Sequence, residues 1–422
     1  MTMPDVSVSN SHVAPHADEI TSIVIENGSS WTRVGYSGEG SPRHIFPTRY
    51  GKDRDNKYYF GNEDVNEYHA GKEIYSPLSD GIVQDWDGIK NLWNYVYKEQ
   101  LDIDPSEVPL AVVEQTWNPS SNKVKAAEVA FEDLQVPLFS LIKSPLCAAY
   151  NSELPSALVI DIGSSVASVT PVIDGNILVK NAVHTKFAGD FITFHIMSSF
   201  RARNIPVTPS FLVKKKVSLE SNTPADPENL YKYPDVTESF NAFQTERVIE
   251  EFKETTSHVS ETPFNPVSSV IGRITRPFEF PDGFNFAFGP ERLATVEPLF
   301  KPNDYPLPGI ALPEGSSGVV DLVNLALANI PAELQEFLLN NIVLTGGTSL
   351  LQGFTARLTN ELVALYPQSK VRVLTSSSHS THKNTNWTGA SILASMGNYD
   401  QLWVSKQEYE EFGAEVVKKR FK

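Results

Sequence analysis

The sequence predicts an α/β protein in which two related lobes enclose a ligand-binding cleft. Three observations predict this class: the length, an internal repeat, and small-residue turns at the ends of apolar strands. With 422 residues and 41% hydrophobic content, the chain exceeds the size at which a single core stops growing, so two lobes are expected. Residues 22–30 and 157–165 match in pattern at every position. A repeat of this spacing indicates duplicated domains rather than a solenoid.

The elements of the first half are expected in the following order. Apolar residues 23–25 form a strand, residues 26–30 a turn, and residues 31–36 a second strand, which together make a hairpin. Two segments with apolar residues at helical spacing follow, and a short apolar segment typical of a strand lies between them. We expect a helix over 87–98, a strand over 108–113 and a helix over 122–134.

The second half repeats this beginning. Residues 158–160 form a strand, 161–165 a turn, and 166–172 the returning strand. Further elements are a helix over 319–329, a strand over 342–344, a helix over 354–365, a strand over 371–374, and part of a helix over 391–396. Polar, proline-interrupted residues 203–245 and 298–315 are expected to be insertions or mobile loops.

Bulk composition narrows the functional class. The single cysteine, Cys147, cannot form an internal disulfide, which favours a reducing compartment. Residues 1–18 are polar and are expected to form a disordered tail without a signal peptide. Because no apolar run is long enough to span a bilayer, we expect a soluble intracellular protein without a membrane partner.

The chain is strongly acidic, with a formal net charge of −16. This argues against direct DNA binding, because neutralising phosphates requires clustered lysine and arginine. Basic partners such as histones are compatible with the charge, although acidity alone also keeps a protein soluble. The short basic run of residues 214–216 fits either a localisation signal or a solvated loop.

The two matching turns have the chemistry of a phosphate clamp. Backbone N–H groups in small-residue turns can surround a triphosphate closely, and serine hydroxyls add donors. An acidic residue precedes each turn, Glu26 or Asp161, and suits a magnesium ion that keeps most of its water. One such turn is usually only a hairpin, but two from duplicated halves indicate phosphates held between lobes.

A third small-residue segment, Thr345 to Thr348, lies between a strand and a helix. Its glycines would let a flat ligand pass close to the backbone, so we favour contact with a nucleoside. The alternative is an ordinary strand-to-helix connection.

These three elements, in this order, resemble the superfamily of actins, sugar kinases and heat-shock ATPases. Residues 42–47, 80–87, 387–395 and 403–409 resemble actins specifically. Residues 36–38, 117–119, 341–349 and 401–404 are similar to the actin-related protein 4 family. The resemblance implies an actin-like ATPase fold: two duplicated ribonuclease-H-like lobes around a nucleotide cleft, with four subdomains.

The resemblance also implies boundaries and a site. The first lobe would hold residues 19–151 and 385–422, with a small subdomain at 48–76; the second would hold 152–384, with an inserted subdomain at 188–311. ATP and Mg²⁺ are the implied cofactors, with Glu26 and Asp161 reaching the metal through water. The implied nucleotide-binding residues are Gly28, Ser29, Ser30, Arg33, Asp161, Gly163, Ser164, Ser165, Lys253, Glu254, Gly346, Gly347, Thr348 and Lys383.

Four departures from the actin pattern predict a changed mechanism. Ser164 replaces a metal-loop aspartate, Ser144 the glutamine that orients water, and Ser168 a nearby histidine. Poorly positioned water predicts little or no hydrolysis. Residues 50–61 are much shorter than actin's filament-contact loop, which predicts poor self-assembly. ATP would then act as a structural ligand of the closed form.

The resemblance therefore implies an ATP-binding, non-polymerising scaffold subunit of nuclear chromatin-remodelling and histone-acetyltransferase complexes. Implied partners are actin, a long helix of a remodeller or scaffold subunit, and other chromatin-complex subunits, with histones a further candidate. The helix would dock in an apolar groove opposite the nucleotide. Candidate groove residues, most of which fit equally well in the core, are Trp117, Ile392, Met396, Tyr399 and Trp403.

The sequence is also compatible with two other classes of function, an active enzyme and a cytoskeletal protein. An active actin-like ATPase or a kinase would need a general base beside the phosphates, and Asp161 is the one candidate. A cytoskeletal, filament-capping actin-related protein is poorly distinguished from a nuclear subunit by sequence.

Overall fold

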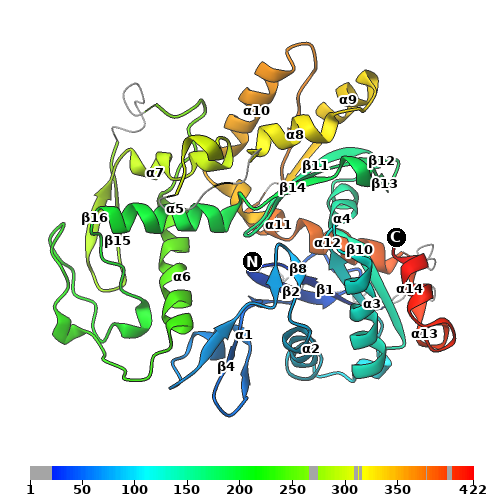
Figure 1. Cartoon of the computed structure of the whole chain (residues 1–422), viewed down its shortest axis with the longest axis horizontal. Coiled ribbons are helices and arrows are strands. Elements are labelled where there is room, and N and C mark those ends of the chain that lie inside the picture. The colour runs from blue at the N-terminus through cyan, green and yellow to red at the C-terminus, as the bar shows by residue number, and fades with distance from the viewer. Residues whose placement is uncertain (1–20, 266–273, 308–311, 313–315, 377, 397–401) are drawn as a thin grey trace, which may run out of the picture.

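The computed structural model describes residues 21–265, 274–307, 312, 316–376, 378–396 and 402–422. The expected tail at 1–18 and the candidate groove residue Tyr399 lie outside these ranges. Two large sheets form the centres of two lobes, with helices around them (Figure 1). No helix within the described ranges is both long and apolar enough to cross a membrane.

The first lobe is built on a six-stranded sheet. Strand β1 (Ile23–Asn27) pairs antiparallel with β2 (Trp31–Tyr36) and parallel with β9 (Leu110–Glu114). Every residue of β9 is buried, as expected for a central strand covered on both faces. The other strands are β3 (His44–Pro47), β10 (Leu138–Lys143) and β19 (Val404–Ser405), and the order is β19-β10-β9-β1-β2-β3.

The second lobe repeats this arrangement. Strand β11 (Ala157–Ile162) pairs antiparallel with β12 (Ala167–Ile173) and parallel with β17 (Ile342–Thr345). The sheet order is β13-β12-β11-β17-β18, with β14 beside β12; the added strands are β13 (Asn176–Ile177), β14 (Val183–Thr185) and β18 (Val373–Leu374).

The two hairpins that begin the lobes have the same register. Asn27 lies opposite Thr32, and Ile162 lies opposite Ala167. Each turn is closed by the same backbone hydrogen bond, from Gly28 N to Trp31 O at 3.1 Å and from Gly163 N to Val166 O at 2.9 Å. The internal repeat predicted from sequence is therefore confirmed in three dimensions.

Helices cover the sheets and join the lobes. Helix α12 (Thr385–Ser395) packs on α4 (Ser144–Asn151) and on strands β1 and β9, while α4 also contacts β11 and β12. A Cβ added to Gly389 would lie 1.9 Å from the carbonyl oxygen of Cys147, so these two helices cross closely. The first-lobe helices are α2 (Trp86–Tyr95), α3 (Ser120–Glu128), α4 (Ser144–Asn151), α12 (Thr385–Ser395), α13 (Lys406–Phe412) and α14 (Ala414–Arg420). The second-lobe helices are α5 (Gly189–Ala202), α6 (Glu238–Thr256), α7 (Glu291–Ala294), α8 (Val319–Leu327), α9 (Ala332–Leu339), α10 (Phe354–Leu365) and α11 (His379–Lys383).

Most expected elements are present, with changed ends. The expected helices over 87–98 and 122–134 each end in a π-helical turn, Val96–Gln100 and Val129–Asp133. The expected strand over 371–374 is reduced to β18.

The expectation of an irregular segment over 203–245 is wrong at its end, because α6 begins at Glu238. Thr237 caps this helix, and Phe240 and Phe243 in its first two turns are buried. Within 298–315, the described part contains the end of one 3-10 turn, Glu297–Leu299, and all of another, Pro302–Asp304.

A small subdomain is attached to the first lobe and contacts the second. It contains β4 (Tyr50–Lys52), β5 (Tyr58–Tyr59), β6 (Glu73–Tyr75) and α1 (Gly61–Asn66). Two further hairpins are formed elsewhere, by β7 (Leu78–Ser79) with β8 (Ile82–Val83) and by β15 (Arg276–Glu279) with β16 (Asn285–Phe288).

The small subdomain contacts both α6 and the segment just before it. The rings of Tyr68 and Tyr233 stack at 4.1 Å. Gly71 N donates to the carbonyl oxygen of Asp235 at 3.0 Å. The Gln244 amide donates to the side chain of Asn66 at 2.9 Å. We call this contact the latch, since it joins the small subdomain to the second lobe; strand β4 and helix α1 lie beside one end of α6 in Figure 1.

The latch predicts an energetic coupling between Tyr68 and Tyr233. Aromatic pairs contribute about 0.5–1.5 kcal/mol beyond their buried area, so a double-mutant cycle of Tyr68→Ala and Tyr233→Ala should give about 1 kcal/mol in urea unfolding. The control pairs Tyr68→Ala with Phe412→Ala, an exposed aromatic in α13, and should give no coupling. Equal coupling in both cycles would contradict the latch.

Candidate functional site

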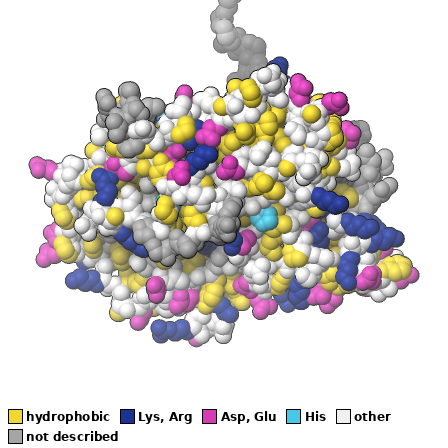
Figure 2. Space-filling view, turned by 45° about the horizontal axis from the view of Figure 1, so that its top comes forward, with side chains coloured by type: hydrophobic (Ala, Val, Ile, Leu, Met, Phe, Trp, Pro, Cys, Tyr) yellow, Lys and Arg dark blue, Asp and Glu magenta, His cyan; other side chains and the backbone are white. Residues whose placement is uncertain are grey.

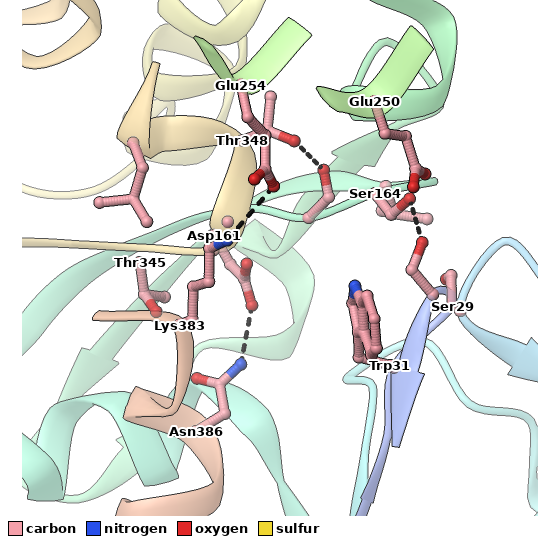
Figure 3. Close-up of a pocket in the computed structure, with 18 of the residues that line it drawn as sticks. Ser29, Trp31, Asp161, Ser164, Glu250, Glu254, Thr345, Thr348, Lys383 and Asn386 are labelled. Atoms are coloured by element: carbon pink, nitrogen blue, oxygen red, sulfur yellow. Dashed lines mark hydrogen bonds and ion pairs between the residues drawn. The ribbon is translucent and has the colours of Figure 1, made fainter. Parts of the chain in front are cut away.

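A cavity of about 440 Å³ lies between the two lobes (Figure 3). It is lined by both hairpin turns, by α6, by the segment after β17, and by residues around α11. The predicted nucleotide-binding residues that line it are Gly28, Ser29, Ser30, Arg33, Asp161, Gly163, Ser164, Lys253, Glu254, Gly346, Gly347, Thr348 and Lys383, and the predicted metal residue Glu26 lines it as well. Residues from five separate regions of the sequence therefore meet at one cavity.

The two serine turns touch across the cleft. The hydroxyl of Ser29 contacts that of Ser165, and the hydroxyl of Ser30 donates to Ser164 Oγ at 2.7 Å. Ser165 does not line the cavity itself, but it holds Ser29 in place. The hydroxyl of Ser164 also donates to the carboxylate of Asp190 at the start of α5. The turns therefore present their backbone to a shared space between the lobes.

The third segment is fixed against the second turn. Thr348 Oγ1 donates to the carbonyl oxygen of Gly163 at 2.7 Å. Gly346 has φ of +89°, and a Cβ there would lie 2.3 Å from the carbonyl oxygen of Ile162. Only glycine fits this backbone without strain. In contrast, a Cβ on Gly347 would meet nothing closer than Lys383 Cε at 4.0 Å.

The residues of α6 have different roles. Lys253 is buried, and its ammonium donates to the carbonyl oxygen of Gly189 at 3.1 Å and to Thr193 Oγ1 at 2.9 Å. It therefore ties α6 to α5, and its ammonium is already engaged. Glu254 is exposed and forms an ion pair with Lys383 at 3.2 Å across the rim of the cavity.

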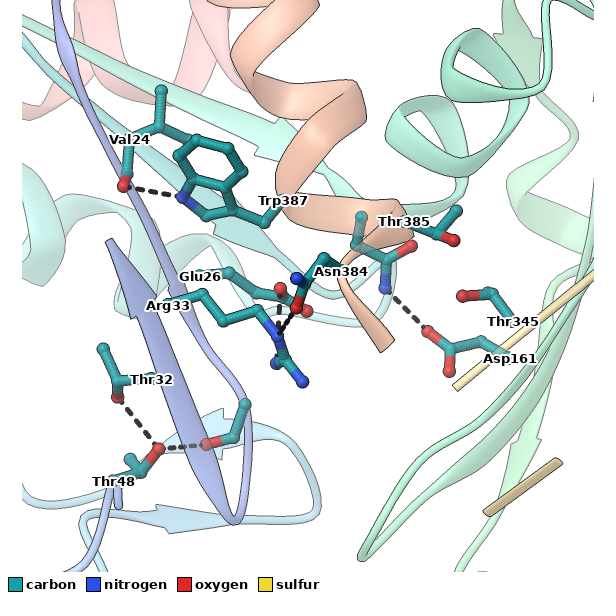
Figure 4. A network of polar contacts seen from close by, with 12 residues as sticks. Val24, Glu26, Thr32, Arg33, Thr48, Asp161, Thr345, Asn384, Thr385 and Trp387 are labelled. Carbon is teal, nitrogen blue, oxygen red and sulfur yellow. Dashed lines mark hydrogen bonds and ion pairs between the residues drawn. The ribbon is translucent and has the colours of Figure 1, made fainter. Parts of the chain in front are cut away.

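The two acidic residues before the turns belong to one polar network (Figure 4). Asp161 Oδ2 accepts a hydrogen bond from the Asn386 amide at 2.9 Å. Arg33 Nη1 lies 3.4 Å from Glu26 Oε2, and Arg33 Nε donates to Asn384 Oδ1 at 2.9 Å. Both carboxylates are thus already paired within the protein.

Burial dominates the titration of this network. It raises the pKa of Asp161 above the ordinary value, although the hydrogen bond from Asn386 and the charge of Arg33 lower it. Burial likewise raises the pKa of Glu26; Arg33 opposes this rise, and the nearby charge of Asp161 adds to it. The two carboxylates therefore share one poorly hydrated environment.

Comparison with known proteins identifies the chain's relatives. A family model described as Actin matches residues 17–422. The chain belongs to the actin family. "Actin-related protein 4" of Yarrowia lipolytica is 40% identical and aligns with 96% of this chain and 97% of its own length. "SWI/SNF and RSC complexes subunit arp42" of Schizosaccharomyces pombe is 41% identical over 96% of this chain and 100% of its own length. "Actin-related protein 4" of the same yeast is 36% identical over 96% of this chain and 98% of its length.

These relatives confirm the resemblance to actin-related protein 4, and the family model confirms the actin-like fold. The departures from actins can now be placed in the structure. Ser168 lines the cavity opposite Asp161 in the hairpin register. Ser144 is buried, and its hydroxyl donates to Gln115 Oε1 at 3.2 Å. Gln115 itself lines the cavity.

Sequence reasoning missed several lining residues of this actin-family site. Arg247, Glu250 and Glu251 lie on α6 at helical spacing from Glu254, and this periodicity could have revealed them. Trp31, Gln115 and Asn386 carried no comparable signal, because each reaches the cavity through tertiary packing.

The structure places the candidate residues of the expected partner groove in different surroundings. Trp117 is not in such a groove: it lines the cavity between the lobes, and its ring stacks on His184 of the second lobe at 4.1 Å. Trp403 is buried in a core cluster against which Met396 packs, while Ile392 is exposed. Trp117 follows strand β9, whose carboxyl end lies at the cavity. This position brings the Trp117 ring to the cavity rather than to the expected groove.

The glycine pair after β17 gives a matched test of the site. Gly346→Ala should lower the free energy of unfolding by about 2 kcal/mol or more, because its Cβ meets backbone at a positive φ. Gly347→Ala should leave thermal unfolding nearly unchanged, because its Cβ has space. Equal destabilisation by both substitutions, measured by calorimetry, would contradict this geometry.

Proposed function

We propose that this chain is an ATP-binding, largely non-hydrolysing and non-polymerising scaffold subunit of nuclear chromatin-remodelling and histone-acetyltransferase complexes. The observation that carries the proposal is its end-to-end similarity to a relative named as a subunit of the SWI/SNF and RSC complexes. Relatives named actin-related protein 4 align with the same share of this chain, 96%. Its localisation would accordingly be the nucleus.

The cavity supports ATP as the ligand. Two turns of the same register offer backbone N–H groups and serine hydroxyls from opposite lobes. Arg33, Arg247 and Lys383 line the same cavity and supply positive charge for phosphates. The segment at Gly346 and Gly347 gives a nucleoside close access to backbone.

The residues near the phosphate turns support weak hydrolysis. Asp161, the candidate general base indicated by the sequence, is half-buried and already accepts the Asn386 amide. Ser144 and Ser168 have side chains too short to orient an attacking water across the cavity. A kinase or fast ATPase would need a base with freedom to take a proton.

The compact hairpin of the small subdomain supports a non-polymerising protein. Strands β4 and β5 are joined by a tight turn in which Asp53 Oδ1 accepts N–H bonds from Asp55 and Lys57, each at 2.9 Å. Such a closed turn offers little extended chain to a neighbouring subunit. A filament needs a head-to-tail contact that this hairpin is poorly shaped to supply.

The proposed partners are actin, a long helix of a larger subunit, other chromatin-complex subunits and histones. Exposed Ile392 and the neighbouring Met396 remain candidates for the helix contact. On the face shown in Figure 2, Lys and Arg side chains are interspersed with Asp and Glu. This distribution, with the net charge of −16, favours protein partners over DNA.

One observation favours a second function, a residual ATPase. Gln115 places an amide at the cavity wall beside Ser144, and an amide can orient a water for attack. The scaffold proposal expects phosphate release slower than about 10⁻⁴ per second, the range of an unassisted GTPase. It also expects Gln115→Leu to change this rate less than about twofold. Faster release that Gln115→Leu abolishes, in a single-turnover phosphate assay, would favour the ATPase.

The scaffold role itself is tested by a tagged pull-down from nuclear and cytosolic extracts of the source cells, with mass spectrometry of the partners. We expect actin together with remodeller or acetyltransferase subunits from the nuclear extract. A variant with Ile392→Asp should lose the helix-bearing subunit and keep its own fold, because this side chain is exposed. Recovery of filament or motor-adaptor proteins from cytosol, without chromatin subunits, would instead support the cytoskeletal rival.

A further inference from the structure

The carboxylates expected to hold a metal are bound to other protein groups. A magnesium ion in a nucleotide site is usually held by one or two carboxylates, by phosphate oxygens and by its own water. Those carboxylates must have lone pairs facing the ion or its water shell. In this chain the Asn386 amide donates to Asp161 at 2.9 Å, and the Arg33 guanidinium lies 3.4 Å from Glu26. One oxygen of each carboxylate, Asp161 Oδ2 and Glu26 Oε2, thus already faces a nitrogen group of the protein.

The network is buried and self-contained. The side chains of Arg33 and Glu26 are only 12% and 13% exposed, so water screens their attraction weakly. Arg33 is held from a second side by Asn384 Oδ1 at 2.9 Å. A divalent cation entering here would meet a fixed guanidinium charge at close range. Displacing Arg33 would leave a buried cation without its carboxylate, which is costly.

Other acidic residues do not offer a replacement site. Glu250, Glu251 and Glu254 also line the cavity, but they belong to α6, and Glu254 is paired with Lys383. Asp190 is engaged with the hydroxyl of Ser164. Within the part of the chain that the structure describes, no three histidine, cysteine or acidic side chains form a metal-binding group. Because Asp161 and Glu26, the carboxylates beside the two turns, already have nitrogen partners, the residues present do not fit a resident divalent cation.

We propose that Arg33 and Asn386 take the place of the divalent cation, so that this cleft binds ATP without Mg²⁺. Arg33 supplies a fixed positive charge beside the first phosphate turn, and Asn386 satisfies the carboxylate that a hydrated metal would otherwise contact. The inference rests on the proposed ATP binding and specifies the ionic form of the ligand. It also gives a physical reason for weak hydrolysis, since the metal that normally neutralises charge in phosphoryl transfer would be missing.

The test is isothermal titration of ATP into nucleotide-stripped protein, once with magnesium chloride and once with EDTA. We expect the two dissociation constants to differ by less than about tenfold. A loss of tenfold or more in EDTA would overturn the inference while leaving ATP binding intact. Absence of binding in both buffers would refute the proposed ATP binding, and the inference with it, so the two failures are distinguishable.

Two variants sharpen this test. Arg33→Met removes the fixed cation. The affinity of this variant for ATP should therefore fall in EDTA and be higher by at least about tenfold in magnesium. Lys383→Met removes a cation that contacts Glu254 and not the buried carboxylates, so its affinity should fall equally in both buffers. An equal fall for Arg33→Met would contradict the role given to Arg33. Thermal unfolding checks that each variant folds, and the wild-type comparison stands without them.

Discussion

The hydroxyl contacts between the two serine turns set the geometry of the cleft. Ser29 meets Ser165, and Ser30 meets Ser164, so the turns of opposite lobes lie within hydrogen-bond distance. Each turn is stiffened by its own backbone hydrogen bond. The spacing of the lobes, the shape of the cavity and the direction of the backbone donors all depend on this meeting. A ligand that bridges the turns would replace these contacts with its own oxygens.

The lobes are held together at other places as well. Helices α4 and α12 cross between the two main sheets, where Gly389 allows contact with the backbone of Cys147. On another side the latch joins the small subdomain to the segment before α6 through Tyr68 and Tyr233. A molecule restrained at several points along its cleft exchanges ligand only when some of these contacts open. That arrangement suits a protein that keeps a nucleotide as part of its structure, which is the role we propose.

The fold was largely predictable from the sequence, because its main signals are local. The repeated strand–turn–strand pattern and the helical spacing of 354–365 need no tertiary information, and both are found as expected. The end of the 203–245 segment was misjudged because its prolines concealed a helix whose start depends on a Thr237 cap and buried aromatics.

The cavity residues in the turns could also be predicted from the sequence. Asn386 and Gln115 were not, because their roles arise from partners distant in the chain. Trp117 was assigned to the wrong surface for the same reason.

In the proposed complex, matching turns from the two lobes clamp one nucleotide, and hydrogen–deuterium exchange with and without saturating ATP would detect this clamp. We expect slower amide exchange in peptides covering 22–36, 157–173 and 342–351 together, with no change in the distant hairpin at 276–288. Protection confined to one lobe, or absent from all three peptides, would contradict the clamp.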